Sequence, residues 1–141
     1  MPYLPTDMPF PDLSLDSEEF WRHCNEGRLM FQTCRCCGVV RHPPTPFCGG
    51  CQSEHYEWVE APKTGRIFSY TVVYKESHKS VVGSLPYNIA LVEFADFKDL
   101  RLVSNIIDME PSGLHIGMEV ILVWEAGPGG QQVPRFMAKR A

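Results

Sequence analysis

Apolar positions divide the chain into a short helical part and a longer part rich in strands. Near the N-terminus, Phe20 and Cys24 recur at helical spacing. Asp16 and Glu19 stand three residues apart, which is the spacing of a capping box. These signals predict a helix over residues 17–26, preceded by an extended arm that contains four prolines.

Beyond residue 66, the apolar positions fall into short runs separated by turn signals. Most runs are rich in aromatic and β-branched residues, and several are apolar on both alternating faces. Five such runs with little helix between them predict a small antiparallel barrel. The expected strands are Ile67–Tyr74, Tyr87–Phe94, Leu102–Ile107, Val120–Trp124 and Arg135–Ala138, with a turn over Asp96–Leu100.

The segment between the helix and the barrel differs from both in composition. Two short strand-like runs, Leu29–Gln32 and Tyr56–Val59, flank a stretch rich in glycine and proline. Such a stretch cannot bury a core of its own, so it needs a covalent or metal cross-link. The predicted organisation is an arm and helix over 1–28, a ribbon over 29–62 and a barrel over 63–141.

Four cysteines have the spacing that supplies such a cross-link. Cys34 and Cys37 form one Cys-x-x-Cys pair, and Cys48 and Cys51 form a second pair after ten intervening residues. Four thiolates satisfy tetrahedral zinc, and a shell closed by cysteine leaves no position for water or substrate. We therefore expect a structural metal ion. Zinc is the favoured metal, but iron accepts the same sulfur ligands and the pattern does not separate the two.

The other two cysteines have less defined roles. Cys36 lies between two ligands, either as a free thiol or as a ligand that exchanges with Cys34 or Cys37. Cys24 lies on the apolar stripe of the helix and is expected to pack as a small hydrophobic residue. Three disulfides are disfavoured, because no secretory signal pattern precedes cysteines that are already grouped in pairs.

Composition and charge narrow the classes of partner. The chain is 44% hydrophobic and 21% charged, as in globular proteins, and its formal net charge is -4. This negative net charge argues against strong electrostatic binding to nucleic acid or anionic membranes. No apolar run approaches 18 residues, so neither a membrane span nor membrane association is expected, and the predicted location is the cytoplasm.

A search for catalytic motifs finds none of the common nucleophile, metalloprotease or phosphate-loop patterns. One long connection, residues 75–86, carries Lys75, His78 and Lys79. Long connections in compact domains are often functional, and these groups are candidates for meeting the phosphates of an anionic ligand. His78 is also compatible with an ordinary polar loop residue, and His42 and His55 are expected to be structural or surface groups.

Several short motifs, taken in order, resemble a known family of small proteins long catalogued as a domain of unknown function. These proteins join an N-terminal helical segment to a rubredoxin-like zinc ribbon and a C-terminal OB fold. One departure is Gln52 after the last cysteine, where glycine is common. The motifs are Phe20-Trp21, Cys34-x-x-Cys37-Gly38, Pro43-Pro44, Cys48-x-x-Cys51, Trp58-Val59-Glu60, Gly65–Tyr74, Pro86-Tyr87, Val92-Glu93, Ile116–Val120 and Pro134-Arg135-Phe136.

The resemblance implies a mainly β fold with a helix, a zinc ribbon and a five-stranded OB barrel. It also implies an accessory subunit of an enzyme acting on coenzyme A thioesters. The partners of such subunits have the thiolase fold and include thiolases, one of them from anaerobic aromatic degradation, and lipid-transfer-protein-like aldolases. The partner carries the catalytic residues, and the small subunit supports it and helps to hold the coenzyme.

The leading hypothesis is therefore a non-catalytic, zinc-containing subunit of a thiolase-type acyl-CoA enzyme, with Lys75, His78 and Lys79 near the coenzyme phosphates. A second hypothesis is a free-standing acyl-CoA binding module. A third is a single-stranded nucleic-acid binder, because aromatic residues on an OB fold can stack bases. Phe68, Tyr70 and Tyr74 alternate along the first barrel strand, but core and subunit contacts are the favoured explanation for them. The acyl group, the partner's reaction and the stoichiometry remain open.

Overall fold

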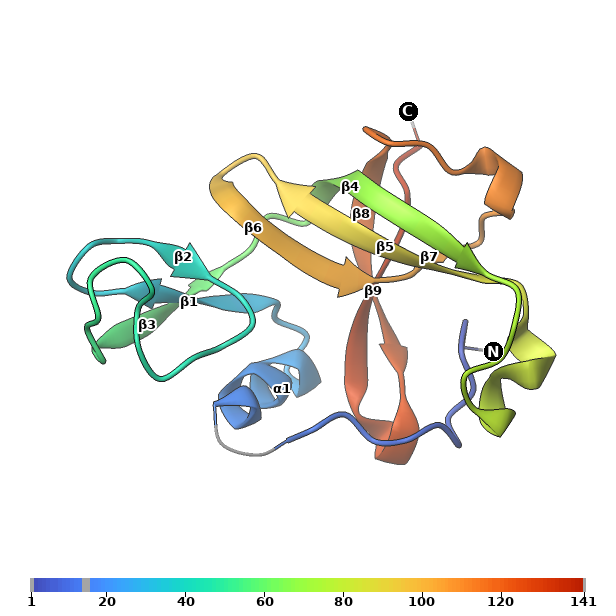
Figure 1. The fold of residues 1–141 in the computed structure, drawn as a ribbon, viewed down its shortest axis with the longest axis horizontal. Coiled ribbons are helices and arrows are strands. Elements are labelled where there is room, and N and C mark those ends of the chain that lie inside the picture. The colour runs from blue at the N-terminus through green and yellow to red at the C-terminus, as the bar shows by residue number, and fades with distance from the viewer. Residues whose placement is uncertain (1, 14–15, 141) are drawn as a thin grey trace.

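The computed structural model describes residues 2–13 and 16–140 (Figure 1). The chain forms an N-terminal arm, one α-helix, a three-stranded sheet and a six-stranded barrel sheet. None of the helices in these two ranges is long and apolar enough to cross a membrane. The predicted order of arm, helix, ribbon and barrel is confirmed.

Helix α1 (Ser17–Asn25) buries Phe20 and Cys24 on one face, as the spacing predicts. The predicted capping box is not formed, because Asp16 is helical and makes no side-chain cap bond. Glu19 instead accepts hydrogen bonds from Tyr56 Oη at 2.9 Å and Trp58 Nε1 at 2.8 Å. This carboxylate therefore fastens the helix to the ribbon.

The ribbon is an antiparallel sheet of β1 (Met30–Cys34), β2 (Val40–Arg41) and β3 (Tyr56–Glu60), with β1 in the middle. Its base joins the rest of the molecule through Phe31, which is fully buried and contacts the rings of Phe94 and Phe97. The long β2–β3 connection is held by Gln32, a buried side chain that accepts a hydrogen bond from the Thr45 amide at 2.8 Å.

The barrel contains β4 (Thr64–Val73), β5 (Tyr87–Phe94), β6 (Phe97–Ser104), β7 (Ile106–Ile107), β8 (Glu119–Ala126) and β9 (Gln132–Ala138). The sheet order is β6-β5-β4-β8-β9-β7. Only Asn105 separates β6 from β7, and β7 pairs with β9 in parallel, so the sheet returns on itself. Counting β6 and β7 as one bent strand gives the predicted five-stranded, OB-like barrel.

Two connections differ from the sequence-based expectation. The third barrel strand begins at Phe97, because the hairpin turn needs only Ala95 and Asp96 and Asp99 takes a positive φ of 61° within the strand. The 75–86 connection contains a 3₁₀ helix, η1 (Lys79–Ser84), which buries Val81. Two further 3₁₀ turns are η2 (Pro111–Gly113) and η3 (Pro128–Gly130).

One apolar core spans the helix, the base of the ribbon and the barrel. Phe20 and Leu29 belong to the same cluster of buried residues as Ile67, Val92 and Phe136. Phe31 and Phe136 are both fully buried in it, and both contact the ring of Phe94. Because the core is shared, the domain limits at 28 and 62 stay a prediction.

Candidate metal centre

The two cysteine pairs meet at the far end of the ribbon. Cys34 closes β1, Cys37 lies in the following turn, and Cys48 and Cys51 lie in the connection before β3. All four sulfur atoms lie within 4.8 Å of one another, with Cys34 to Cys51 and Cys37 to Cys48 both at 3.5 Å. A tetrahedral ion with sulfur ligands at about 2.3 Å separates them by roughly 3.8 Å. The cluster is therefore positioned to bind a metal.

The two pairs adopt the same local geometry. The Gly38 amide donates to the Cys34 carbonyl at 3.0 Å, and the Gln52 amide donates to the Cys48 carbonyl at 2.9 Å. Both residues have a positive φ, 77° for Gly38 and 65° for Gln52. Glycine adopts this conformation freely, whereas glutamine is strained in it. The departure at position 52 therefore costs local stability without moving a ligand.

Backbone amides favour the charged form at each of the four sulfur atoms, and at Cys34 and Cys48 the net result is a lowered pKa, whereas neighbouring thiols and burial raise the pKa of Cys37 and Cys51. The Cys37 and Cys36 amides, at 3.5 and 3.4 Å from Cys34 Sγ, lower the pKa of Cys34 to about 6. Amides of Cys51 and Gly50 lower the pKa of Cys48 in the same way. Amide donors of this kind stabilise a thiolate before it binds a metal.

The remaining two cysteines lie outside the cluster. Cys36 is exposed, its Sγ donates to Ser53 Oγ at 3.2 Å, and it does not belong to the group of four sulfur atoms that meet. Cys24 is fully buried in the core, and burial raises the pKa of its thiol to about 12. The expectation that Cys24 packs as an apolar residue is confirmed.

His42 has a structural environment. Its ring packs between Phe20 and Phe31, with centroids 4.8 and 5.2 Å away. Burial lowers the pKa of His42 to about 4, so the ring is neutral near pH 7. His42 therefore contributes to the junction of helix, ribbon and barrel, while His55 is exposed.

The basic connection lies at the opposite end of the molecule from the cysteines, beside the far end of β4 (Figure 1). Lys75, His78 and Lys79 are all exposed there. His78 precedes η1 as its N-cap and accepts the Ser80 amide at 3.2 Å through Nδ1. Neither lysine forms an ion pair with any residue in 2–13 or 16–140. The two lysines therefore keep their charges available, whereas His78 has a capping role that its sequence position did not reveal.

A separate cleft of about 550 Å³ opens near the ribbon, where β4, β6 and β8 begin and β5 ends. Its cations are largely neutralised: Arg66 and Lys139 both contact Glu119, at 3.3 and 3.5 Å, and Arg101 contacts Glu93 at 3.8 Å. Its lining contains no cysteine, serine or histidine. This lining therefore lacks the serine–histidine and cysteine–histidine pairs that activate a hydroxyl or thiol nucleophile.

Comparisons with known families agree with the two halves of the fold. A family model described as ChsH2, rubredoxin-like zinc ribbon domain, matches residues 21–57. A second, described as ChsH2, C-terminal OB-fold domain, matches residues 58–125. Together they cover the second half of the helix, the ribbon and the barrel through most of β8.

Three relatives are similar in sequence. A probable enoyl-CoA hydratase alpha subunit of Thermomonospora curvata is 37% identical over 121 residues, which are 85% of this chain but only 37% of that protein. A DUF35 domain-containing scaffold protein of Methanothermobacter thermautotrophicus is 32% identical over 74% of this chain and 77% of its own length. One of Methanocaldococcus jannaschii is 29% identical over 74% and 73%.

Two solved structures are similar in fold. A chain of the Ltp2-ChsH2(DUF35) aldolase has a TM-score of 0.82 and 33% identity, and the match covers 92% of this chain and 98% of that chain. A DUF35 protein of unknown function from Sulfolobus solfataricus has a TM-score of 0.63 at 20% identity, which supports the fold alone. The chain therefore belongs to the DUF35 family and carries a ChsH2-type zinc ribbon followed by a C-terminal OB fold.

Proposed function

We propose that this protein is a non-catalytic scaffold subunit of a thiolase-type enzyme that acts on acyl-CoA thioesters. One observation carries the proposal: the chain matches 98% of a chain from an aldolase assembly, with a TM-score of 0.82. Relatives named scaffold proteins point the same way. The relative named as an enoyl-CoA hydratase subunit supports the acyl-CoA part of the proposal.

The proposed metal is zinc, held by Cys34, Cys37, Cys48 and Cys51. The donor set fits the ion, because four sulfur atoms gather within 4.8 Å and amides stabilise thiolates at two of them. Four thiolates complete a tetrahedral shell, so the ion supplies a cross-link and no open coordination position for chemistry. Catalytic groups then belong to the partner.

Co-purification tests the main proposal. The chain, tagged at its C-terminus and expressed in its native host, is expected to capture a thiolase-fold protein in a fixed stoichiometry. The purified complex should turn over an acyl-CoA thioester, whereas the chain alone should not. A stable chain without any thiolase-fold partner, or an isolated chain that is active, would contradict the proposal.

Lys75, His78 and Lys79 are the proposed contacts to the coenzyme phosphates, supported by their exposure and by the unpaired lysine charges. The double change Lys75→Glu and Lys79→Glu is expected to raise the KM for the thioester about tenfold in the complex, with little change in kcat. Lys63→Glu is a matched control, because Lys63 is exposed at the opposite end of β4. An unchanged KM in the double variant would remove this connection from the site.

Calorimetry separates this proposal from that of a free-standing module. The isolated chain is expected to bind an acyl-CoA at least tenfold more weakly than the complex. Equal affinity would favour the free-standing binding module instead.

A further inference from the structure

The N-terminal arm lies across one face of the barrel (Figure 1). Leu4 is buried against Val81 of η1 and Tyr87 of β5, at one end of this face. At the other end, Phe10 lies so close to Gly129 of η3 that a Cβ added there would collide with its ring. The arm therefore bridges the β4–β5 and β8–β9 connections.

This position is the place where OB folds hold extended ligands. Their binding face is formed by the second and third barrel strands and flanked by the connections after the first and fourth strands. Here those strands are β5 and the bent pair of β6 and β7, and the two connections are the ones that the arm bridges. The chain's own N-terminal segment thus occupies the ligand face.

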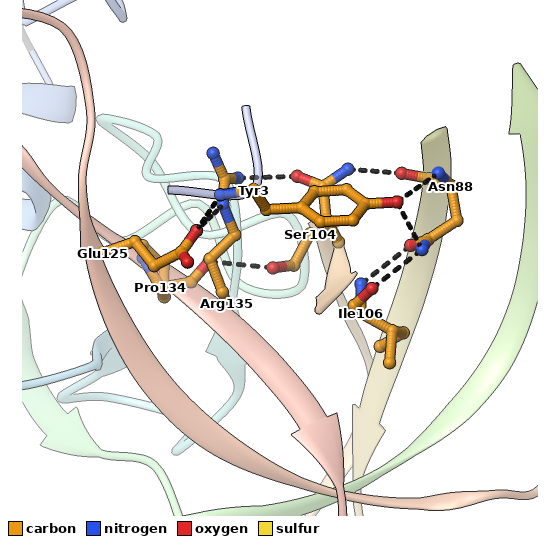
Figure 2. A network of polar contacts seen from close by, with 8 residues as sticks. Tyr3, Asn88, Ser104, Ile106, Glu125, Pro134 and Arg135 are labelled. Atoms are coloured by element: carbon orange, nitrogen blue, oxygen red, sulfur yellow. Dashed lines mark hydrogen bonds and ion pairs between the residues drawn. The ribbon is translucent and has the colours of Figure 1, made fainter. Parts of the chain in front are cut away.

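Tyr3 makes specific contacts with the strands of the barrel (Figure 2). Its hydroxyl accepts hydrogen bonds from the backbone amide and the side-chain amide of Asn88, at 2.9 and 2.8 Å. Its backbone amide donates to the Glu125 carboxylate at 3.0 Å. Burial raises the pKa of Tyr3, so the phenol stays neutral.

The residues beneath Tyr3 form a connected polar network across the strands. Asn88 bonds both polar groups of the Ile106 backbone, at 2.7 and 2.8 Å. Asn105 donates to the Asn88 carbonyl and accepts from Arg135 at 2.6 Å. Arg135 in turn pairs with Glu125 at 3.4 Å, and only 11% and 15% of these two side chains is exposed. A buried network of this kind holds its members in one arrangement.

We infer that this face is a peptide-binding site and that the arm is its resident ligand. The site takes an extended, proline-rich segment in which a tyrosine precedes a bulky aliphatic residue. The tyrosine hydroxyl meets Asn88, the tyrosine amide meets Glu125, and the aliphatic side chain enters the pocket beside Val81. The arm covers the face on which OB folds bind single-stranded nucleic acid.

A peptide supplied in trans tests the inference on the full-length protein. The probe is a fluorescent peptide with the sequence of residues 2–13. The double variant Tyr3→Ala with Leu4→Ala should bind it saturably. Wild type should bind at least tenfold more weakly, because its own arm competes at an effective concentration in the millimolar range. A probe peptide carrying the same two alanines should not bind to either protein.

Tyr3→Phe provides a conservative second variant that keeps the ring and the backbone contacts. It removes only the hydroxyl acceptor, so its affinity for the probe should fall between those of wild type and the double variant. The inference is overturned if folded variants bind the probe no better than wild type does. It is equally overturned if the alanine-substituted peptide binds as well as the natural one.

Discussion

Two regions of this molecule, the barrel and the cysteine end of the ribbon, are stabilised by different means. The barrel closes around buried side chains from every strand, among them Ile67, Val92 and Phe136. Within residues 2–13 and 16–140, the cysteine end of the ribbon has no comparable core, and two of the four clustered cysteines are exposed. Stability in the barrel is thus distributed over many contacts, whereas at the ribbon tip we propose that it depends on one metal ion held by the four clustered cysteines.

The two regions are nevertheless packed against each other, because the base of the ribbon belongs to the barrel core. Phe31 on β1 contacts barrel rings, and Glu19 of α1 holds Tyr56 and Trp58 on β3. The contrast is therefore between the tip of the ribbon and the remainder of the chain. The proposed metal site therefore predicts a rigid base and a tip whose order follows metal content.

The largest expected effect comes from removing a ligand. Cys48→Ser should abolish stoichiometric zinc binding, because Cys48 is fully buried in the cluster and zinc shells of this kind contribute on the order of 10 kcal/mol. Hydrogen exchange should then show lost protection between residues 34 and 55, with the barrel strands still protected. Cys36→Ser is the matched control and should keep one zinc ion. A folded, zinc-loaded Cys48→Ser protein would contradict the account.

Phe31→Ala tests whether the ribbon base and the barrel form one unit. Deleting this fully buried ring should lower the free energy of unfolding by about 3–5 kcal/mol in denaturant titrations of the zinc-loaded protein. Probes in the ribbon and in the barrel should shift together. Phe47→Ala, at a position 54% exposed, should change stability by only about 0.5 kcal/mol. A shift confined to ribbon probes would mean that the two regions unfold separately.

Acid should weaken the junction through His42. Its pKa is lowered from 6.5 to about 4 in the folded state, so the unfolded chain takes up the proton more readily. The contribution of neutral His42 is fully present above pH 6.5 and is lost as the pH falls toward 4, by up to about 3 kcal/mol.

His42→Gln should therefore flatten the stability profile between pH 6.5 and 4, measured by denaturant titration. Protonation of the metal ligands affects both proteins alike, so the difference between the profiles isolates His42. His55→Gln, at an exposed position of the ribbon, should leave the profile unchanged. A wild-type profile identical to that of His42→Gln would refute this role.

The smallest effect is a gain at the ribbon tip. Gln52→Gly should raise stability by up to about 1 kcal/mol, because it relieves a positive φ of 65° in a turn that matches the one at Gly38. The measurement is the zinc concentration at which the tip folds, or the chelator concentration at which it unfolds. A loss of zinc affinity would show that the Gln52 side chain has a role of its own.

Much of the fold follows from local patterns. The cysteine spacing predicts that four sulfur atoms lie together. Each Cys-x-x-Cys turn is a local structure that positions two sulfur atoms, and two such pairs match the four ligands of one tetrahedral ion. Apolar runs locate most strands, because their alternation reflects burial within the barrel. The start of β6 is missed because Lys98 and Asp99 are exposed and resemble a turn in composition, although they continue the strand.

Other features depend on residues that are distant in sequence. Nothing in the arm's composition reveals that Tyr3 meets Asn88 and Glu125, because proline-rich segments have no period that points to a partner. Glu19 fits a capping box by spacing, yet its carboxylate accepts hydrogen bonds from Tyr56 and Trp58 instead. Tertiary hydrogen bonds override a local preference worth about 1 kcal/mol.

X-ray absorption at the zinc edge tests the central claim most directly, on the metal-loaded protein alone and in complex with its captured partner. The account predicts one zinc ion with four sulfur ligands at about 2.3 Å and the same spectrum in both samples. A nitrogen or oxygen ligand, or a spectrum that changes when an acyl-CoA thioester is added to the complex, would show an open site and contradict a purely structural metal.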